Sequence, residues 1–555
     1  MFDFKIAHQF FSLLRANFNT NRDQLNALDS AVGDGDHGFT ALRAFQAAEI
    51  AALSESSSLS KVFDLAAEAM AENAGGAIGP LLAAFFGEAA VVWTGKDQVG
   101  LSEFSDWFYG GMHAVMEVGG AAPGEKTLLD ALLPAAEALK NTSGETMFSA
   151  VQAAAAAAMV GAKATTSMTA VHGRAHFSGD RSRGYQDAGA TSAALIVQTL
   201  ADTLSGKFAE PVDARHEEFS IPSGKLINSP ESMVREDNEG LALAYPQLVA
   251  LTPEGILTRA TSKDSNKVGL AIGHGGGHTP SMGGLIGPGL LDADVYGPIF
   301  TCASGIRIAE AIRAADHGCG VVLLISNHSG DVLNARLALR RAAQEGIRVA
   351  PVYLGDDLAT APRAKLSERR GLGGLLFALK TGGAAAEAGL PLEEVVRVMQ
   401  KTNERTATLS VAVSSPNHPA TGQPLFSLPD GYIEVGTGVH GEIGVYRGVA
   451  MPADNLVDLL LGRLVVDIQG FKEKKLLVFI NGAGGTSRME LHILFRRTYH
   501  ALLAKGYQIA GSVIDSLFTT QEMGGFSLSL CVVDEELEAL WNAPAAAPCF
   551  HMPIN

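Results

Sequence analysis

The sequence changes character near residue 205, and this change constrains the fold more than any other feature. Residues 1–203 are rich in Ala and Leu and have few β-branched runs, which favours helices. From about residue 225, short apolar β-branched segments repeatedly run into turns of Gly, Asp and Asn, which is typical of α/β layers. We therefore expect a multidomain protein, with an N-terminal all-α helical barrel or bundle and a C-terminal α/β domain.

The expected boundaries follow from local composition. Residues 204–224 carry two prolines, mixed charge and little periodicity, which indicates a linker. The stretch TATLSVAVSS opens a second α/β segment after residue 405. We expect a helical domain at 1–203, a first α/β subdomain at 225–405 and a second at 406–555.

Charge and hydropathy limit the partners. The net charge of −17 disfavours binding to nucleic acid or to an anionic membrane. No uninterrupted apolar run reaches the roughly 18 residues of a membrane span, and the N-terminus resembles an amphipathic helix more than a signal peptide. The four cysteines lack zinc spacing. We expect a cytoplasmic protein without nucleic-acid or membrane partners.

Three carboxylates crowd the segment LDSAVGDGDHG at residues 28–38, namely Asp29, Asp34 and Asp36. Such carboxylates repel one another unless cations neutralise them, and Mg²⁺ prefers oxygen ligands and leaves positions open for phosphate. The segment is not an EF-hand, because position 12 from Asp34 is Phe45 rather than Glu. The alternative is a turn in which Asp34 or Asp36 caps a helix.

Glycines precede an apolar helix in ENAGGAIGPLLAAFF, residues 72–86. The N–H groups at such a helix start can bind an anion, although a closely packed helix–helix turn explains the pattern equally well. No GxxxxGK[ST] motif occurs, so any nucleotide site is not a P-loop.

A long polar loop, residues 173–195, carries Arg174, Arg181, Arg183 and Asp187 between two apolar helices. Long loops in compact domains are usually functional. An arginine in this loop could face phosphate groups, or it could simply be a solvated surface residue.

Together with PGEKTLLDAL (123–132), these segments resemble the nucleotide-binding L domain of the dihydroxyacetone kinase family over about residues 5–200. The resemblance implies an eight-helix barrel that binds ATP or ADP through two Mg²⁺ ions held by Asp29, Asp34 and Asp36. It also implies nucleotide contacts from His37, Gly75, Gly76, Ala77, Ile78, Thr127, Arg181 and Asp187. The family usually has serine at Ile78, so we expect phosphate contact to be weakened or rearranged there.

In the second half, polar loops follow predicted strands. They are GHGGGHTPSMGG (273–284), SNHSGDVLN (326–334) and EVGTGVHGEIGVYR (434–447). The first loop has the wrong glycine register and a proline for a dinucleotide fold, and it lacks the glutamate of an HExxH zinc site. Taken singly, each histidine in these loops is more often structural than catalytic.

Taken together, the second half resembles the substrate-binding K domain of the same family, from KLINSPESMVRE (225–236) through NGAGGTSRMEL (481–491) to the end. The resemblance implies that His440 forms a covalent hemiaminal with the ketone carbon of a small ketose, and that Asp331 acts as base. It implies further substrate contacts from His278, Gly275, Gly276, Gly277 and Ser326. It also implies a homodimer, although most single-chain members place the sugar domain first.

Several positions depart from the family pattern: Ser326 replaces lysine, His328 replaces tyrosine, Thr279 replaces glutamate and Ile443 replaces proline. Because serine is smaller than lysine, we expect a roomier pocket that accepts erythrulose as well as dihydroxyacetone. The expected activity is ATP-dependent phosphorylation of a primary hydroxyl of such a ketose. Two alternatives stay open: a non-catalytic ketose-binding regulator, and a Mn²⁺-dependent lyase acting on FAD as a side activity.

Overall fold

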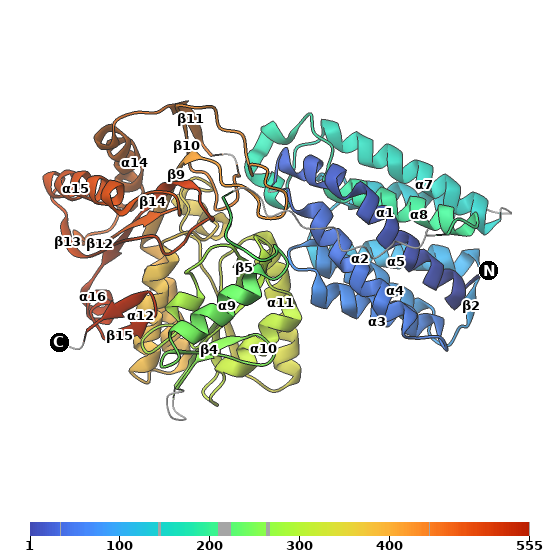
Figure 1. Cartoon of the computed structure of the whole chain (residues 1–555), viewed down its shortest axis with the longest axis horizontal. Helices are drawn as coiled ribbons and strands as arrows, with labels where there is room; N and C mark the ends of the chain where they lie inside the picture. The colour runs from blue at the N-terminus through green and yellow to red at the C-terminus, as the bar shows by residue number, and fades with distance from the viewer. Residues whose placement is uncertain (34, 142–145, 209–223, 262–266, 443, 554–555) are drawn as a thin grey trace. The chain divides into compact units, whose positions relative to one another are not determined.

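The computed structural model describes the whole chain except residues 34, 142–145, 209–223, 262–266, 443 and 554–555 (Figure 1). The chain forms two compact units, Met1–Phe219 and Ser220–Asn555. The first is helical and the second is α/β, which confirms the predicted fold class.

The described part of the first unit contains eight α-helices. These are α1 (Phe4–Ser30), α2 (His37–Leu53), α3 (Leu59–Asn73), α4 (Ile78–Val92), α5 (Leu101–Gly119), α6 (Leu129–Lys140), α7 (Met147–Ala164) and α8 (Ala188–Leu204). Two 3-10 helices, η1 (Thr165–Ser167) and η2 (Arg174–Ser182), lie between α7 and α8, and a small antiparallel pair joins β1 (Phe2–Asp3) to β2 (Gln98–Val99). The sequence did not predict this pair.

Aromatic side chains fill one end of the helical core. The ring of Phe63 lies 4.8 Å from that of Trp93 and 5.4 Å from that of Trp107, both edge-on. Edge-to-face pairs of this kind add to the free energy gained by burial. The indole nitrogen of Trp107 donates to the carbonyl of Phe85 at 2.9 Å, so this polar group is satisfied inside the core.

One helical segment, Met147–Ser167, is long and apolar enough to cross a membrane by length and composition. The sequence reading, which looked for an uninterrupted apolar run, did not detect it. Core helices pass the same test, and Ala150, Ala154 and Ala158 on one face of α7 are fully buried in the helical core.

The described part of the second unit contains two six-stranded sheets. The first has the order β3-β4-β6-β5-β7-β8 and the second the order β11-β10-β9-β14-β12-β13. In the first sheet β6 (Ala293–Ile299), β5 (Gly269–Gly276), β7 (Val321–Ile325) and β8 (Val349–Tyr353) are parallel, while β3 (Val249–Leu251) and β4 (Leu257–Arg259) form an antiparallel edge.

The second sheet is mainly antiparallel. Its strands are β9 (Thr406–Ser414), β10 (Tyr432–Val435), β11 (Tyr446–Val449), β12 (Lys475–Gly482), β13 (Gln508–Asp515) and β14 (Gly524–Val533), and only β12 and β13 pair in parallel. A terminal hairpin joins β15 (Ala545–Ala547) to β16 (Phe550–Met552).

Helices and 3-10 turns cover these sheets. They are α9 (Met233–Ala244), η3 (Gly283–Leu285), α10 (Gly305–Ala315), α11 (Ser329–Gln344), η4 (Arg363–Glu368), α12 (Leu375–Glu387), α13 (Leu392–Glu404), α14 (Ala453–Ile468), α15 (Arg488–Ala504) and α16 (Glu535–Trp541). Every residue of α12 from Leu375 to Ala386 is buried. Its side chains share one core with Leu324 of β7 and Phe479 of β12, so both sheets pack on a common centre.

Candidate active site

In the helical unit, the predicted aspartates lie where α1 ends and α2 begins. The Asp29 carboxylate accepts hydrogen bonds from the backbone N–H groups of Gly35 at 2.8 Å and Asp36 at 3.1 Å. The loop is therefore folded around one predicted ligand, and Asp36 is itself nearly buried. Asp34, the third predicted ligand, lies outside the described residues.

Asp187 adds a carboxylate to this end of the unit. It caps α8 by accepting from the N–H of Ala190 at 2.7 Å. Burial raises the pKa of Asp187 to about 7; its bond from Ala190 and the charge of Lys126 oppose the rise, and the charges of Asp29 and Asp130 add to it. Carboxylates that repel one another fit a divalent cation with oxygen ligands, so this donor set fits Mg²⁺.

His37 begins α2, and its Nε2 lies 2.7 Å from the hydroxyl of Ser192 on α8. Burial lowers the pKa of His37, although the charge of Asp29 acts in the opposite direction. The imidazole is thus held neutral between two helices beside the aspartates.

The glycine segment lies at the start of α4. Gly76 has φ +68° and Ala77 occupies the N-cap position without a side-chain cap, so Gly75 and Gly76 lead into a helix start with backbone donors. Gly79 must be glycine, because a Cβ there would lie 1.8 Å from the carbonyl oxygen of Ala74. Ile78 packs against the helical core, which accounts for an apolar residue at this position.

Two further predicted nucleotide contacts, Thr127 and Arg181, lie on different segments of the helical unit. The N–H of Thr127 donates to Asp130 at 2.7 Å in the turn before α6. Arg181 is exposed on η2, whereas Arg174 on the same segment lies 3.5 Å from the Asp36 carboxylate. Arg174 thus lies beside a predicted metal ligand.

Lys126 is a residue that sequence reasoning missed, although it stands in the quoted GEKTLLDAL motif. It is buried with φ +61°, and its ammonium group donates to the carbonyls of Thr165, Met168, Ser182 and Tyr185 at 2.6–3.3 Å. One side chain thus fixes the loop between α7 and α8 that leads to Asp187.

In the α/β unit, His278 and His440 lie side by side. His278 follows β5 of the first sheet, and His440 follows β10 of the second. Their Nε2 atoms lie 3.0 Å apart. His278 follows the carboxyl end of β5, and its Nδ1 lies 2.7 Å from the carbonyl oxygen of Thr519. Because a carbonyl can only accept, Nδ1 of His278 carries a proton. Burial, and then the charge of His440, lowers the pKa of His278 well below its usual value.

Glu442 holds the other side of the His440 ring. Its carboxylate lies 3.4 Å from Nδ1 of His440 and also accepts the backbone N–H of that residue. Burial alone would raise the pKa of Glu442, but Arg370, 3.4 Å away, and His440 hold it well below its usual range. The same guanidinium binds Asp357 at 2.7 Å, so one buried cation serves two carboxylates.

The carboxyl end of β7, the neighbour of β5, supplies Ser326 and Asp331. The Ser326 hydroxyl donates to the Asp331 carboxylate at 2.5 Å, and Asp331 is buried in the first turn of α11. Side chains at the carboxyl ends of adjacent parallel strands share one edge of the sheet, which is where α/β proteins bind ligands. The structure thus places Asp331 and Ser326 at the same sheet edge as His278.

Gly275, Gly276 and Gly277 form the end of β5 and the turn into His278. Gly277 has φ +91°, and a Cβ there would lie 2.9 Å from the ring of Phe300. Phe300 itself has φ +57°, which is rare outside glycine, and its ring lies 5.6 Å from the rings of both His278 and His440. Sequence reasoning missed Phe300, since only the fold brings it to the histidines.

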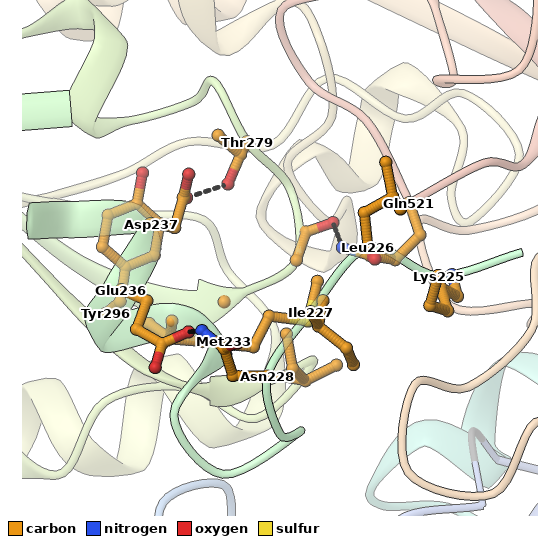
Figure 2. A pocket seen from close by; sticks show the side chains of 14 residues that line it. Lys225, Leu226, Ile227, Asn228, Met233, Glu236, Asp237, Thr279, Tyr296 and Gln521 are labelled. Atoms are coloured by element: carbon orange, nitrogen blue, oxygen red, sulfur yellow. Dashed lines mark hydrogen bonds between the residues drawn. The ribbon is translucent and has the colours of Figure 1, made fainter. Parts of the chain in front are cut away.

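A cavity of about 620 Å³ lies on this glycine turn (Figure 2). Gly276, Gly277 and Thr279 line it, whereas His278 and His440 do not. Asp237 on α9 points at Thr279 and accepts its hydroxyl at 2.8 Å, and burial raises the pKa of Asp237. Asp237 was also missed, because it lies 42 positions from its partner.

Comparison with known protein families gives two matches. Residues 239–549 match the Dak1 domain, which is more than half of the chain, and residues 31–202 match the DAK2 domain. The chain belongs to the dihydroxyacetone kinase family. Its helical DAK2 domain precedes its α/β Dak1 domain, as the sequence indicated.

Curated relatives in this family include an L-erythrulose kinase of Pectobacterium atrosepticum, 37% identical over 59% of this chain and 56% of that protein. A D-erythrulose kinase of Mycolicibacterium smegmatis is also 37% identical, again over 59% and 56%. The chain thus matches about half the length of these relatives. A dihydroxyacetone-binding subunit of Listeria innocua is 34% identical over 56% of this chain and 95% of that protein.

Two solved structures extend the comparison. The dihydroxyacetone kinase of C. freundii in complex with AMP-PNP and Mg²⁺ is 29% identical, with a TM-score of 0.55 over 60% of this chain and 61% of that chain. A dihydroxyacetone kinase operon co-activator is also 29% identical, with a TM-score of 0.54 over 56% and 97%.

Proposed function

We propose that this protein is an ATP- and Mg²⁺-dependent kinase that phosphorylates a primary hydroxyl of a small ketose, erythrulose or dihydroxyacetone, held as a hemiaminal on His440. The observation that carries the proposal is the 3.0 Å contact between the Nε2 atoms of His440 and His278, with Glu442 on the opposite side of the His440 ring. A neutral imidazole in such a frame is a competent nucleophile toward a carbonyl.

The proton positions follow from the contacts. His278 keeps its Nδ1 proton on the Thr519 carbonyl, so its Nε2 accepts the Nε2–H of His440. With Glu442 ionised, His440 can carry a second proton on Nδ1 as an imidazolium. His278 is the base that removes the Nε2 proton and exposes the His440 lone pair.

Capture then proceeds in one balanced step. The Nε2 lone pair of His440 forms a bond to the ketone carbon, the C=O π bond breaks, and its electrons pass to oxygen. His278 returns the proton to that oxygen, and its low pKa makes it a strong acid for this transfer. The positive charge stays on the His440 ring, where Glu442 stabilises it. Capture at a carbonyl carbon selects ketoses over polyols, which have no such carbon.

Asp331 is the base for phosphoryl transfer. Its carboxylate, oriented by the Ser326 hydroxyl, accepts the proton of the terminal hydroxyl as that oxygen attacks the γ-phosphorus.

At the nucleotide, Asp29, Asp36 and Asp187, with the predicted Asp34, would hold two Mg²⁺ ions, and the α4 start and His37 would face phosphate. When bound, Mg²⁺ spreads the charge that develops on the transferred group. We further propose a homodimer.

A direct test uses dihydroxyacetone labelled with ¹³C at the ketone carbon. We expect its resonance to move from the carbonyl range to the tetrahedral range on binding wild-type protein and to stay in the carbonyl range with His440→Ala. ADP release with dihydroxyacetone, both erythrulose enantiomers and glycerol then ranks the substrates. An unshifted resonance in wild type would overturn the covalent site, and His440→Ala should still bind Mg-ATP.

A ketose-binding regulator is the second candidate. It is favoured by the similarity of the α/β unit to an operon co-activator and by the departures at Ile78 and Ser326. The two functions separate cleanly, because a regulator shows the shifted ¹³C resonance without release of ADP. The lyase side activity is tested by incubating FAD with Mn²⁺ and following AMP.

A further inference from the structure

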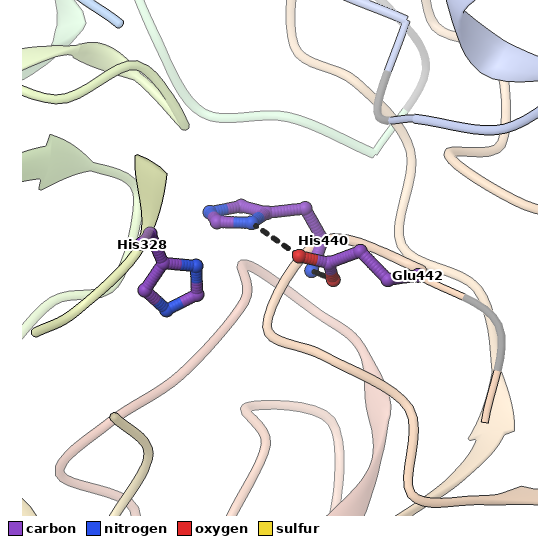
Figure 3. Close-up of side chains that lie close together, drawn as sticks. All are labelled: His328, His440 and Glu442. Carbon is purple, nitrogen blue, oxygen red and sulfur yellow. Dashed lines mark hydrogen bonds and ion pairs between the residues drawn. The ribbon is translucent and has the colours of Figure 1, made fainter. Parts of the chain in front are cut away.

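Two imidazoles and a carboxylate converge beside the proposed capture site. One potential ligand atom from each of His328, His440 and Glu442 lies within 4.8 Å of the other two (Figure 3). Nδ1 of His440 and Oε1 of Glu442 are 3.4 Å apart. Ligand atoms around a tetrahedral zinc ion, with bonds of roughly 2.0–2.2 Å, are separated by about 3.3 Å. The distance between Nδ1 of His440 and Oε1 of Glu442 is therefore close to the spacing that a tetrahedral zinc ion needs.

Hydrogen-bond accounting gives both imidazoles a lone pair suited to a metal. If His440 keeps only the Nε2 proton that it directs at His278, its Nδ1 presents a lone pair to Glu442. Nε2 of His328 lies 3.3 Å from the carbonyl oxygen of Gly371, which can only accept, so the His328 proton lies on Nε2. Its Nδ1 therefore also carries a lone pair.

A lone pair that faces a carboxylate is repulsive unless a cation lies between them. The second proton of the imidazolium is one such cation, and a metal ion is another. The surrounding charges favour a cation, because Asp357 and Glu442 are fully buried and share the single guanidinium of Arg370. When ionised, these two carboxylates and this guanidinium together carry a charge of −1, which a cation at the cluster would offset.

We propose that His328, His440 and Glu442 bind a divalent transition-metal ion of the zinc class, and that the metal-bound protein does not capture ketoses. Imidazole nitrogens and one carboxylate are the ligands such ions prefer, and three protein ligands leave a fourth position for water. The metal replaces the Nδ1 proton and keeps the other proton on Nε2, so His440 has no lone pair for a carbonyl carbon. The second half of this proposal rests on the proposed function; metal binding itself does not.

The test compares wild type with His328→Gln, using Zn²⁺ in equilibrium dialysis and Co²⁺ absorption as a report of tetrahedral coordination. His317→Gln, on the loop between α10 and β7, is the matched control. We expect His328→Gln to lose the tetrahedral Co²⁺ spectrum and to bind Zn²⁺ more weakly by at least the roughly 10–100-fold that loss of an outer-shell partner costs. His317→Gln should behave as wild type. The aspartates of the helical unit are the same in all these proteins, so Zn²⁺ bound by them cancels when wild type is compared with a variant.

Competition is read from the ¹³C resonance of bound dihydroxyacetone. Stoichiometric Zn²⁺ should suppress the tetrahedral signal in wild type, EDTA should restore it, and His328→Gln should keep the signal at the same Zn²⁺ concentration. Equal Zn²⁺ affinity in wild type, His328→Gln and a second variant, His328→Asn, would overturn the metal site. An undiminished signal in Zn²⁺-loaded wild type would overturn the inhibition. No signal even in metal-free wild type would instead refute the covalent capture, and dialysis would still decide the metal site.

Discussion

The Glu442 carboxylate touches His440 twice, through the backbone N–H and, at 3.4 Å, through Nδ1 of the ring. Both residues lie in one short loop after β10, and both are buried. The second contact stabilises a second proton on Nδ1 of His440, so that Nε2 can attack a substrate once His278 has removed the Nε2 proton.

Glu442→Gln should therefore reverse the tautomer. With the amide oxygen on the backbone N–H, the amide NH₂ faces Nδ1 and favours the proton on Nε2. We expect ketose turnover to fall by about 10²–10⁴-fold, as when the carboxylate that orients a catalytic histidine is neutralised. Mg-ATP affinity should stay at the wild-type value. Wild-type turnover in the variant would show that Glu442 does not orient the ring.

Ser326→Lys should change substrate preference. The longer side chain fills space beside Asp331, whose carboxylate now accepts the hydroxyl of the shorter serine. We expect the ratio of kcat/KM for erythrulose to that for dihydroxyacetone to fall by about tenfold, since one or two lost methylene-sized spaces are worth about 1–3 kcal/mol. Ser329→Lys, at an exposed position of α11, is the control. An unchanged ratio would contradict the roomier pocket.

Lys126→Met should loosen the loop between α7 and α8. Its ammonium group donates to the carbonyls of Thr165, Met168, Ser182 and Tyr185. The substitution removes this donor and leaves two buried acceptors, the carbonyls of Thr165 and Ser182, without it. At about 1–3 kcal/mol for each unsatisfied group, the local cost is several kcal/mol. Hydrogen exchange should accelerate over residues 165–187 and stay unchanged in the α/β unit. Lys163→Met, on α7, is the control.

Asp36→Asn should weaken nucleotide binding without unfolding the helical unit. The substitution removes a carboxylate from the predicted Mg²⁺ site and weakens the 3.5 Å ion pair with Arg174. We expect Mg-ATP affinity, measured by calorimetry, to fall by at least tenfold while ¹³C capture of dihydroxyacetone persists. Loss of both would contradict the separation of the two sites.

Lys380→Met should stabilise the α/β unit at neutral pH. Burial lowers the pKa of Lys380 to about 8 from 10.5. The unfolded chain therefore binds this proton more readily, and stability falls as pH falls from about 10.5 to about 8, by roughly 3 kcal/mol. Methionine removes this cost.

The gain is reduced because Lys380 donates to the carbonyl of Leu540 at 2.9 Å, a bond worth about 1 kcal/mol. We expect a net gain of about 1–2 kcal/mol at pH 7 and a flatter profile between pH 8 and 10.5, measured by calorimetry. A variant that is less stable than wild type at pH 7, with the same dependence of stability on pH, would show that the buried lysine does not destabilise the folded state.

The sequence by itself determined the architecture and the local motifs. Helix-forming residues before 205 and β-branched segments after 225 specify helices and strands through short-range preferences. Clustered residues such as Asp29 and Asp36, or Gly75 and Gly76, are neighbours in the chain and need no fold to bring them together. Even Ser326 and Asp331 could be paired from sequence, because one strand end and one helix start hold both.

Only the tertiary structure decided which distant groups meet. His278 and His440 are separated by 162 positions, and Thr519 lies a further 79 along the chain, yet the two sheets bring all three into contact. Phe300, Arg370 and Lys126 act through backbone carbonyls, ring faces and buried charge, which have no signature in a linear pattern. Packing around a common core fixes such contacts, because burial makes each unpaired charge or carbonyl costly and so selects the arrangement in which these groups have partners.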